Sequence, residues 1–159
     1  MPASLLLSLL LGGCGVVAAV PVDGDWSVAP GTVAVDDCDQ VDDGDDSIWP
    51  QGYTLTSQEG GFALLETLSE VAVDCDLARG SFECGASESS DSGSQGSDSY
   101  TVTQSTVLSG EVQSDVEMDA VASTIITCES GGNLCSDIES TLGLSFPCSV
   151  VLEFGMAAD

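Results

Sequence analysis

The sequence has no lysine and no histidine, and its one basic side chain is Arg79. Without histidine, the chain cannot build a Ser-His-Asp or Cys-His catalytic group or a histidine-ligated metal site. Without lysine, it cannot form a Schiff base or a P-loop. Asp and Glu together number 27, and the resulting formal charge of −26 would repel nucleic acid. These absences exclude many enzyme classes and favour a non-catalytic protein that does not bind nucleic acid.

An apolar run near the N-terminus gives the most specific motif. Residues Ala3 to Leu11 are too few to span a bilayer and are typical of the apolar part of a secretory signal peptide. The run ends in Leu11-Gly12-Gly13-Cys14, which resembles the lipobox of bacterial lipoproteins. The resemblance implies cleavage before Cys14 and acylation of its thiol and amine by chains such as palmitate, which would anchor the protein to a membrane. It also implies an outer-membrane address, because Gly15 replaces the Asp that marks inner-membrane retention in enteric lipoproteins.

Two other interpretations of the N-terminus stay open, because residues 1–4 contain no Lys or Arg. Ordinary signal cleavage after Ala19 would give a secreted or periplasmic protein. Alternatively, the run from Leu5 to Val22 would stay uncut as a poor anchor. The lipobox interpretation divides the chain into a signal peptide over 1–13, a tether over 14–23 and a single domain over 24–159.

The remaining cysteines agree with export. They are even in number, which in an exported chain predicts three disulfides with fifteen possible pairings. They are Cys38, Cys75, Cys84, Cys128, Cys135 and Cys148. Alternating residues on both sides of Arg79-Gly80 predict a hairpin in which Cys75 lies directly opposite Cys84, with Cα atoms about 4.5 Å apart and within disulfide range. Cys128 and Cys135 bracket a turn-rich loop that could close on itself, and elimination then pairs Cys38 with Cys148.

Most of the chain after residue 23 alternates apolar and polar side chains, which predicts β-strands. The expected strands are Asp25–Ala29, Thr32–Asp36, Tyr53–Ser57, Phe62–Thr67, Val71–Ala78, Ser81–Ala86, Tyr100–Val112, Val116–Cys128 and Cys148–Met156. Pro30-Gly31 is predicted to be a turn, and the Ser-rich segment Ser87–Ser99 a mobile loop. Ser136 and Glu139 fit a capping box for one short helix near Asp137–Leu142, before the last strand.

Such a chain of strands with short turns predicts an antiparallel up-and-down meander, closed into a barrel or, alternatively, folded into a β-sandwich. Gly24-Asp25-Trp26 resembles the G-x-W motif that opens lipocalin and related calycin barrels. The resemblance implies a calycin-like barrel in which Arg79 is the one candidate for the arginine that caps the Trp.

A barrel of this kind could hold a ligand among its aromatic side chains. The candidate ligand-binding residues are Trp26, Tyr53 and Tyr100, with Trp49 a further aromatic that could line a cavity. Small side chains at Ser114, Ala120 and Ala122 would leave room for a cavity.

A dense acidic run lies between the second and third expected strands. Seven carboxylates fall within eleven residues, at Asp36, Asp37, Asp39, Asp42, Asp43, Asp45 and Asp46. Calcium binds six to eight oxygens in a bendable loop, so the composition permits a calcium site. The spacing is not that of an EF-hand, and the other interpretation is a solvated acidic loop without any cofactor.

The sequence therefore predicts an all-β, disulfide-linked lipoprotein of the cell envelope that is not an enzyme. Its partners would be the membrane, through the lipid anchor, and a small apolar ligand or an envelope protein. The alternative is a structural or calcium-dependent surface module without a ligand cavity. The presence or absence of a cavity distinguishes the two hypotheses.

Overall fold

The computed structural model describes residues 19–39 and 48–159. Within these ranges the chain forms nine strands and one helix, which agrees with the predicted all-β class and the short helix before the last strand. In chain order they are β1 (Gly24–Asp36), β2 (Gly52–Gln58), β3 (Gly61–Glu66), β4 (Ala72–Ala78), β5 (Ser81–Cys84), β6 (Ser87–Gln95), β7 (Asp98–Val112), β8 (Glu117–Ser130), α1 (Leu134–Leu142) and β9 (Cys148–Ala158).

The strands form a closed antiparallel barrel. Strands β1 to β5 pair in chain order, β7 to β9 pair in chain order, and β9 pairs with β1. Pairing of β5 with residues 109–111 of β7 closes the cylinder, so eight of the strands described make the barrel and β6 lies outside it. The predicted up-and-down barrel is confirmed, and the sandwich alternative is wrong because the sheet has no break into two layers.

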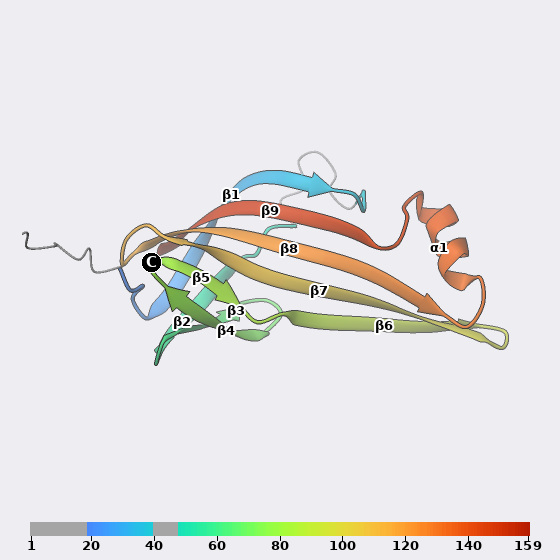
Figure 1. Cartoon of the computed structure of the whole chain (residues 1–159), viewed down its shortest axis with the longest axis horizontal. Helices are drawn as coiled ribbons and strands as arrows, with labels where there is room; N and C mark the ends of the chain where they lie inside the picture. The colour runs from blue at the N-terminus through green and yellow to red at the C-terminus, as the bar shows by residue number, and fades with distance from the viewer. Residues whose placement is uncertain (1–18, 40–47) are drawn as a thin grey trace, which may run out of the picture.

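The barrel has two different ends (Figure 1). We call the end with the β2–β3, β4–β5 and β7–β8 turns the closed end; the described N-terminal residues and the C-terminus also lie there. The open end carries the connections that follow β1 and β3. Beyond the open end, β7, β8 and β9 run on towards α1, and β6 pairs with residues 98–106 of β7, as the long ribbons in Figure 1 show. We call this part the extension.

Large apolar side chains fill the closed end. Trp26 is 1% exposed, and its indole Nε1 donates a hydrogen bond to the carbonyl oxygen of Val22 at 3.1 Å. The rings of Phe62 and Phe82 meet edge to face with centroids 5.4 Å apart. Alternate residues of β9 are buried along the strand, as predicted: Cys148, Val150, Leu152, Phe154 and Met156. The last two inward residues, Phe154 and Met156, belong to this core. The closed end is therefore a packed core.

The three disulfides are the pairs that the sequence predicts. Cys75 bonds Cys84 across the β4–β5 hairpin, with Cα atoms 3.8 Å apart. The turn has Arg79 and Gly80 at φ values of 57° and 88°, which matches the two-residue hairpin turn with both central residues left-handed. The other pairs are Cys38–Cys148 and Cys128–Cys135.

Pro30-Gly31 is not a turn, so the prediction of two short strands is wrong. Both residues lie within β1, which continues past them with a shift of register against β9 between Ala29 and Thr32. A Cβ on Gly31 would lie 2.0 Å from the carbonyl oxygen of Glu153, so only glycine allows β9 to approach this closely. Glycine within a strand marks such bulges and close approaches.

The mobile loop predicted for residues 87–99 is also wrong, because residues 87–95 form β6. Apolar burial does not explain this strand, since most of it is exposed. It is held by its ladder to β7 and by paired hydroxyls, Ser90 with Thr103 at 3.0 Å and Ser92 with Thr101 at 2.9 Å. Cross-strand hydroxyl pairs of this kind contribute modestly to sheet stability.

The predicted capping box at Ser136 and Glu139 is wrong as well. Helix α1 begins at Leu134, with Asn133 as its N-cap and no side-chain capping bond. Glu139 Oε1 instead accepts a hydrogen bond of 2.7 Å from the backbone N–H of Phe146. Glu139 therefore orders the chain between α1 and β9.

Candidate functional site

The open end of the barrel contains a cavity of about 360 Å³. Its walls come from β2, β3, β4, β7, β8 and β9, and its rim comes from residues 48–50, residues 68–69 and the start of β6. Cavities of this size are typical of small-molecule sites. The packed core at the closed end forms its floor.

The cavity wall is mainly apolar. The side chains of Trp49, Leu108, Ala122 and Leu152 all line it and are each no more than 9% exposed. Trp49 follows the connection from β1 and meets Phe154 edge to face, with ring centroids 6.4 Å apart. Pairing in register brings Leu108 and Leu152 to opposite sides of Ala122. The small Ala122 side chain leaves open space between two large neighbours.

Two polar residues face the cavity from one side. On β3, Phe62 and Leu64 point into the barrel, and the period of two gives Glu66 the same direction. Glu66 lies directly opposite Tyr53 on β2, and its carboxylate accepts a hydrogen bond from the Ser69 hydroxyl. Burial raises the pKa of Tyr53 well above its ordinary value, and the charge of Glu66 raises it further. The Tyr53 hydroxyl is therefore protonated at neutral pH.

A second hollow of about 240 Å³ adjoins the first on the inner face of the extension. The two share Ser89 and Gln104 in their walls. The apolar residues around the second hollow come from β7, β8, α1 and the chain that follows α1: Val102, Ile126, Ile138, Leu142, Leu144 and Phe146. We call it the groove. Together, the cavity and the groove form an elongated site.

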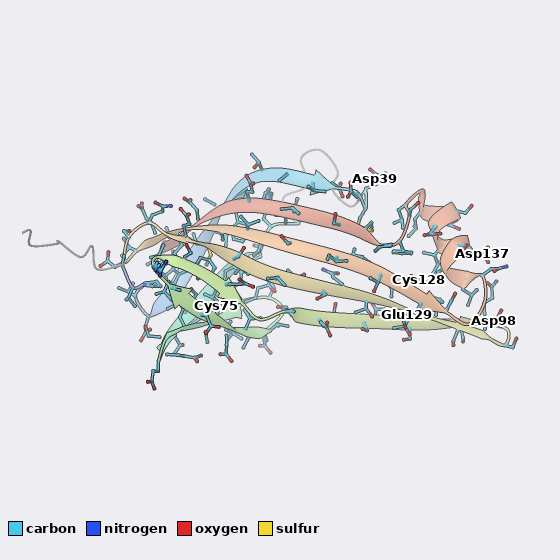
Figure 2. The ribbon with its side chains drawn as sticks, in the orientation of Figure 1. Asp39, Cys75, Asp98, Cys128, Glu129 and Asp137 are labelled. Carbon is cyan, nitrogen blue, oxygen red and sulfur yellow. A yellow bond between two sulfur atoms is a disulfide. The ribbon has the colours of Figure 1, made fainter. Side chains whose placement is uncertain are left out.

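Helix α1 is joined to β8 at its first turn, and a glycine ends it beside the groove. The Cys128–Cys135 disulfide joins its first turn to β8. Its last turn is followed by Gly143, whose left-handed φ of 74° ends the helix and whose N–H bonds back to Glu139. Figure 2 shows Cys128 beside α1, with the acidic Asp98, Glu129 and Asp137 around the same end of the extension.

The structure places one of the three predicted ligand-binding residues in the cavity. Tyr53 lines it, whereas Trp26 lies in the packed core of the closed end. Tyr100 lies on the extension, where its ring covers Gly93 of β6. Trp49, the fourth aromatic considered, also lines the cavity.

Of the small residues expected to leave room, only Ala122 lines the cavity. Ala120 belongs to the core, and Ser114 lies in the β7–β8 turn at the closed end. Glu66 was not among the predicted ligand-binding residues, although the alternation of Phe62 and Leu64 places it on the inner face of β3.

The predicted calcium site is only partly within the described residues. Asp42, Asp43 and Asp45 lie outside them, as does Asp46. Asp37 accepts a hydrogen bond from the Ser149 hydroxyl at 3.0 Å, and Asp39 follows β1 with a φ of 50° (Figure 2). Asp36, the third carboxylate described, is the last residue of β1. Across residues 19–39 and 48–159, no three Asp, Glu, Cys or His side chains come together as a metal site.

The N-terminal motif also falls outside the described residues, including the predicted lipidation site Cys14. No helix in the described part of the chain is long and apolar enough to cross a membrane. Arg79 lies in the β4–β5 turn at the closed end, far along the barrel from the cavity rim.

Comparisons with protein-family models, with curated proteins and with solved structures found no match for this chain. The function is therefore inferred from the residues of the cavity and from the sequence motifs.

Proposed function

We propose that this protein is an exported, lipid-anchored and non-catalytic binding protein whose barrel cavity holds a small apolar ligand. The observation that carries the proposal is the cavity of about 360 Å³ with Trp49, Leu108 and Leu152 in its wall. The alternative, a structural or calcium-dependent module, requires a barrel filled by its own side chains. Side chains fill the barrel in this way at the closed end, but the open end contains the cavity.

Two further observations support export and a non-catalytic role. Three disulfides join the described chain, and disulfides persist in oxidising compartments such as the periplasm and the cell surface. The sequence has no His or Lys to serve as a base or nucleophile in the cavity. The lipobox supports attachment to the outer membrane.

A neutral apolar dye tests the binding proposal. Residues 15–159, which contain every described element, would be exported to a periplasm and titrated with N-phenyl-1-naphthylamine. We expect saturable fluorescence with one dye per chain. The Ala122→Leu variant should weaken dye binding by about tenfold or more, because the added side chain enters the cavity.

Ser123→Leu is the matched control for Ala122→Leu, because Ser123 is the next residue of β8 and points to the solvent. It should bind the dye as the unmodified chain does. Circular dichroism would show whether both variants keep the fold. Equal loss of binding in both variants, or no saturable binding at all, would contradict the proposal.

Mass spectrometry of the full chain after export tests the anchor separately. We expect a mature protein that begins at Cys14 and carries acyl chains. A product that begins at Val20 without lipid would instead support secretion after cleavage behind Ala19. Replacement of Cys14 by Ser should abolish the acylated form.

A further inference from the structure

Glu66 places a carboxylate in the wall of the apolar cavity, and no cationic side chain among the described residues pairs with it. The residue is half-buried at the end of β3, and a Ser69 hydroxyl donates the one hydrogen bond that its carboxylate accepts from the described residues. The chain's one basic side chain, Arg79, lies in the turn at the closed end. The charge of Glu66 is therefore not neutralised by a neighbouring side chain.

Removing a carboxylate from water costs free energy unless an opposite charge and hydrogen bonds replace the lost hydration. The Ser69 hydroxyl replaces only part of the hydration that the Glu66 carboxylate would lose. Glu66 is half-buried, so water can reach its carboxylate from the open end, but an apolar ligand that fills the cavity would displace this water. A ligand with its own cationic group would replace the lost water with a charge-assisted hydrogen bond, which is about twice as strong as a neutral one.

The other carboxylates of the site are also negatively charged, and they too favour a ligand with a cationic group. Glu88 lies at the cavity rim, and Asp91 lines the groove. An anionic ligand such as a fatty acid would meet repulsion from Glu66, Glu88 and Asp91 and no compensating cation. A neutral ligand would leave Glu66 without a partner.

We infer that the ligand is a cationic amphiphile, an organic amine whose ammonium group pairs with Glu66 and whose apolar body lies against Trp49, Leu108 and Leu152. The inference rests on the proposed function, because it specifies the ligand of the same cavity. The protonated Tyr53 hydroxyl beside Glu66 offers the amine a second polar contact. The adjoining groove gives room for a longer apolar body.

Three probes with the same octyl chain and different head groups test the inference. Octylammonium, 1-octanol and octanoate would be titrated calorimetrically into the exported chain of residues 15–159, at concentrations below micelle formation. We expect octylammonium to bind at least about tenfold more tightly than octanol, which is the range expected for a hydrogen bond to a charged group. Octanoate should bind most weakly.

Two charge-neutralising variants separate local pairing from the general attraction of cations to an acidic protein. Glu66→Gln should remove the preference for octylammonium and keep the affinity for octanol. Glu83→Gln changes the net charge equally, but Glu83 lies exposed on the outside of β5, so the preference should stay. Circular dichroism and the retained binding of octanol would show that each variant is folded.

The possible failures are distinguishable. If octanol binds and octylammonium gains nothing over it, or if Glu66→Gln keeps the preference, the cationic ligand is refuted and an apolar binding site remains. If Glu83→Gln loses the preference as fully as Glu66→Gln, long-range attraction explains it and the pairing is refuted. If none of the three probes binds to the folded chain, the proposed function itself fails.

Discussion

The Cys38–Cys148 disulfide should stabilise the protein more than either of the other two, because it closes a far longer loop. It joins residues separated by 110 positions, whereas Cys75 and Cys84 are separated by 9. The loss of chain entropy in the unfolded state grows with the logarithm of loop length, which gives about 5 kcal/mol for the long loop and about 2.7 kcal/mol for the short one. All four cysteines are no more than 4% exposed, so the loss of packing should be similar at both sites.

The measurement compares two double variants by urea denaturation, Cys38→Ala with Cys148→Ala and Cys75→Ala with Cys84→Ala. We expect the first pair to lose about 2 kcal/mol more unfolding free energy than the second. A domain of this size has a total stability of about 5–15 kcal/mol, so the first variant should lose between about a third and all of its stability. Equal losses in the two variants, with equal m-values, would refute the reasoning from loop length.

Three other predictions concern charge, backbone packing and pH. The melting temperature should be higher in molar salt than in dilute buffer, because salt screens the repulsion between like charges. Asp76 and Glu83, for example, face each other directly across β4 and β5. Equal melting temperatures would contradict this prediction. Gly31→Ala should cost about 1–3 kcal/mol in chemical denaturation because its Cβ would overlap a backbone carbonyl of β9, whereas Gly131→Ala, with no atom within 4 Å, should cost much less. The free energy of unfolding should fall as the pH rises through about 10. In that range Tyr53 ionises in the unfolded chain, whereas its raised pKa keeps it protonated in the folded protein. An equally steep fall in Tyr53→Phe would show that another group is responsible.

The fold was predictable where several local signals agree on the same residues. Around Arg79-Gly80, the turn residues, the alternation on both sides and the spacing of two cysteines all require one hairpin register. The structure has that register, with Cys75 opposite Cys84 and Leu77 opposite Phe82. The alternation in β9 likewise determines which of its residues are buried.

The errors lie where a strand is held by its partner and not by its own pattern. Strand β6 has no apolar alternation, and it forms because β7 extends past the barrel and offers it a ladder. In β1, the Pro30-Gly31 pair has the composition of a turn. The adjacent β9 makes it a bulge instead, through a contact between residues more than 120 positions apart that no local signal contains.

The cavity was only partly predictable for the same reason. Barrel closure decides which aromatic residues belong to the core and which line the open end, and closure depends on the pairing of β5 with β7. Trp26 and Trp49 cannot be told apart by composition, yet one fills the closed end and the other lines the cavity. Glu66 could have been predicted from the sequence, because the alternation of β3 directs it inward and a charged residue at an inward position indicates a functional site.

The chain enters the barrel at the closed end, and this fixes the direction in which the cavity opens. The N–H of Val22 bonds to the carbonyl of Asp115 in the β7–β8 turn, so the described N-terminal residues lie against the closed end. Pro21 is buried and Val22 is bonded, so a lipid on Cys14 would leave residues 15–20 as the free tether, which can span about 20 Å at most. The closed end would then face the bilayer and the cavity mouth would face away from it. An anchored protein of this geometry would collect its ligand from the aqueous compartment or from an opposing surface, and not from the membrane that holds it.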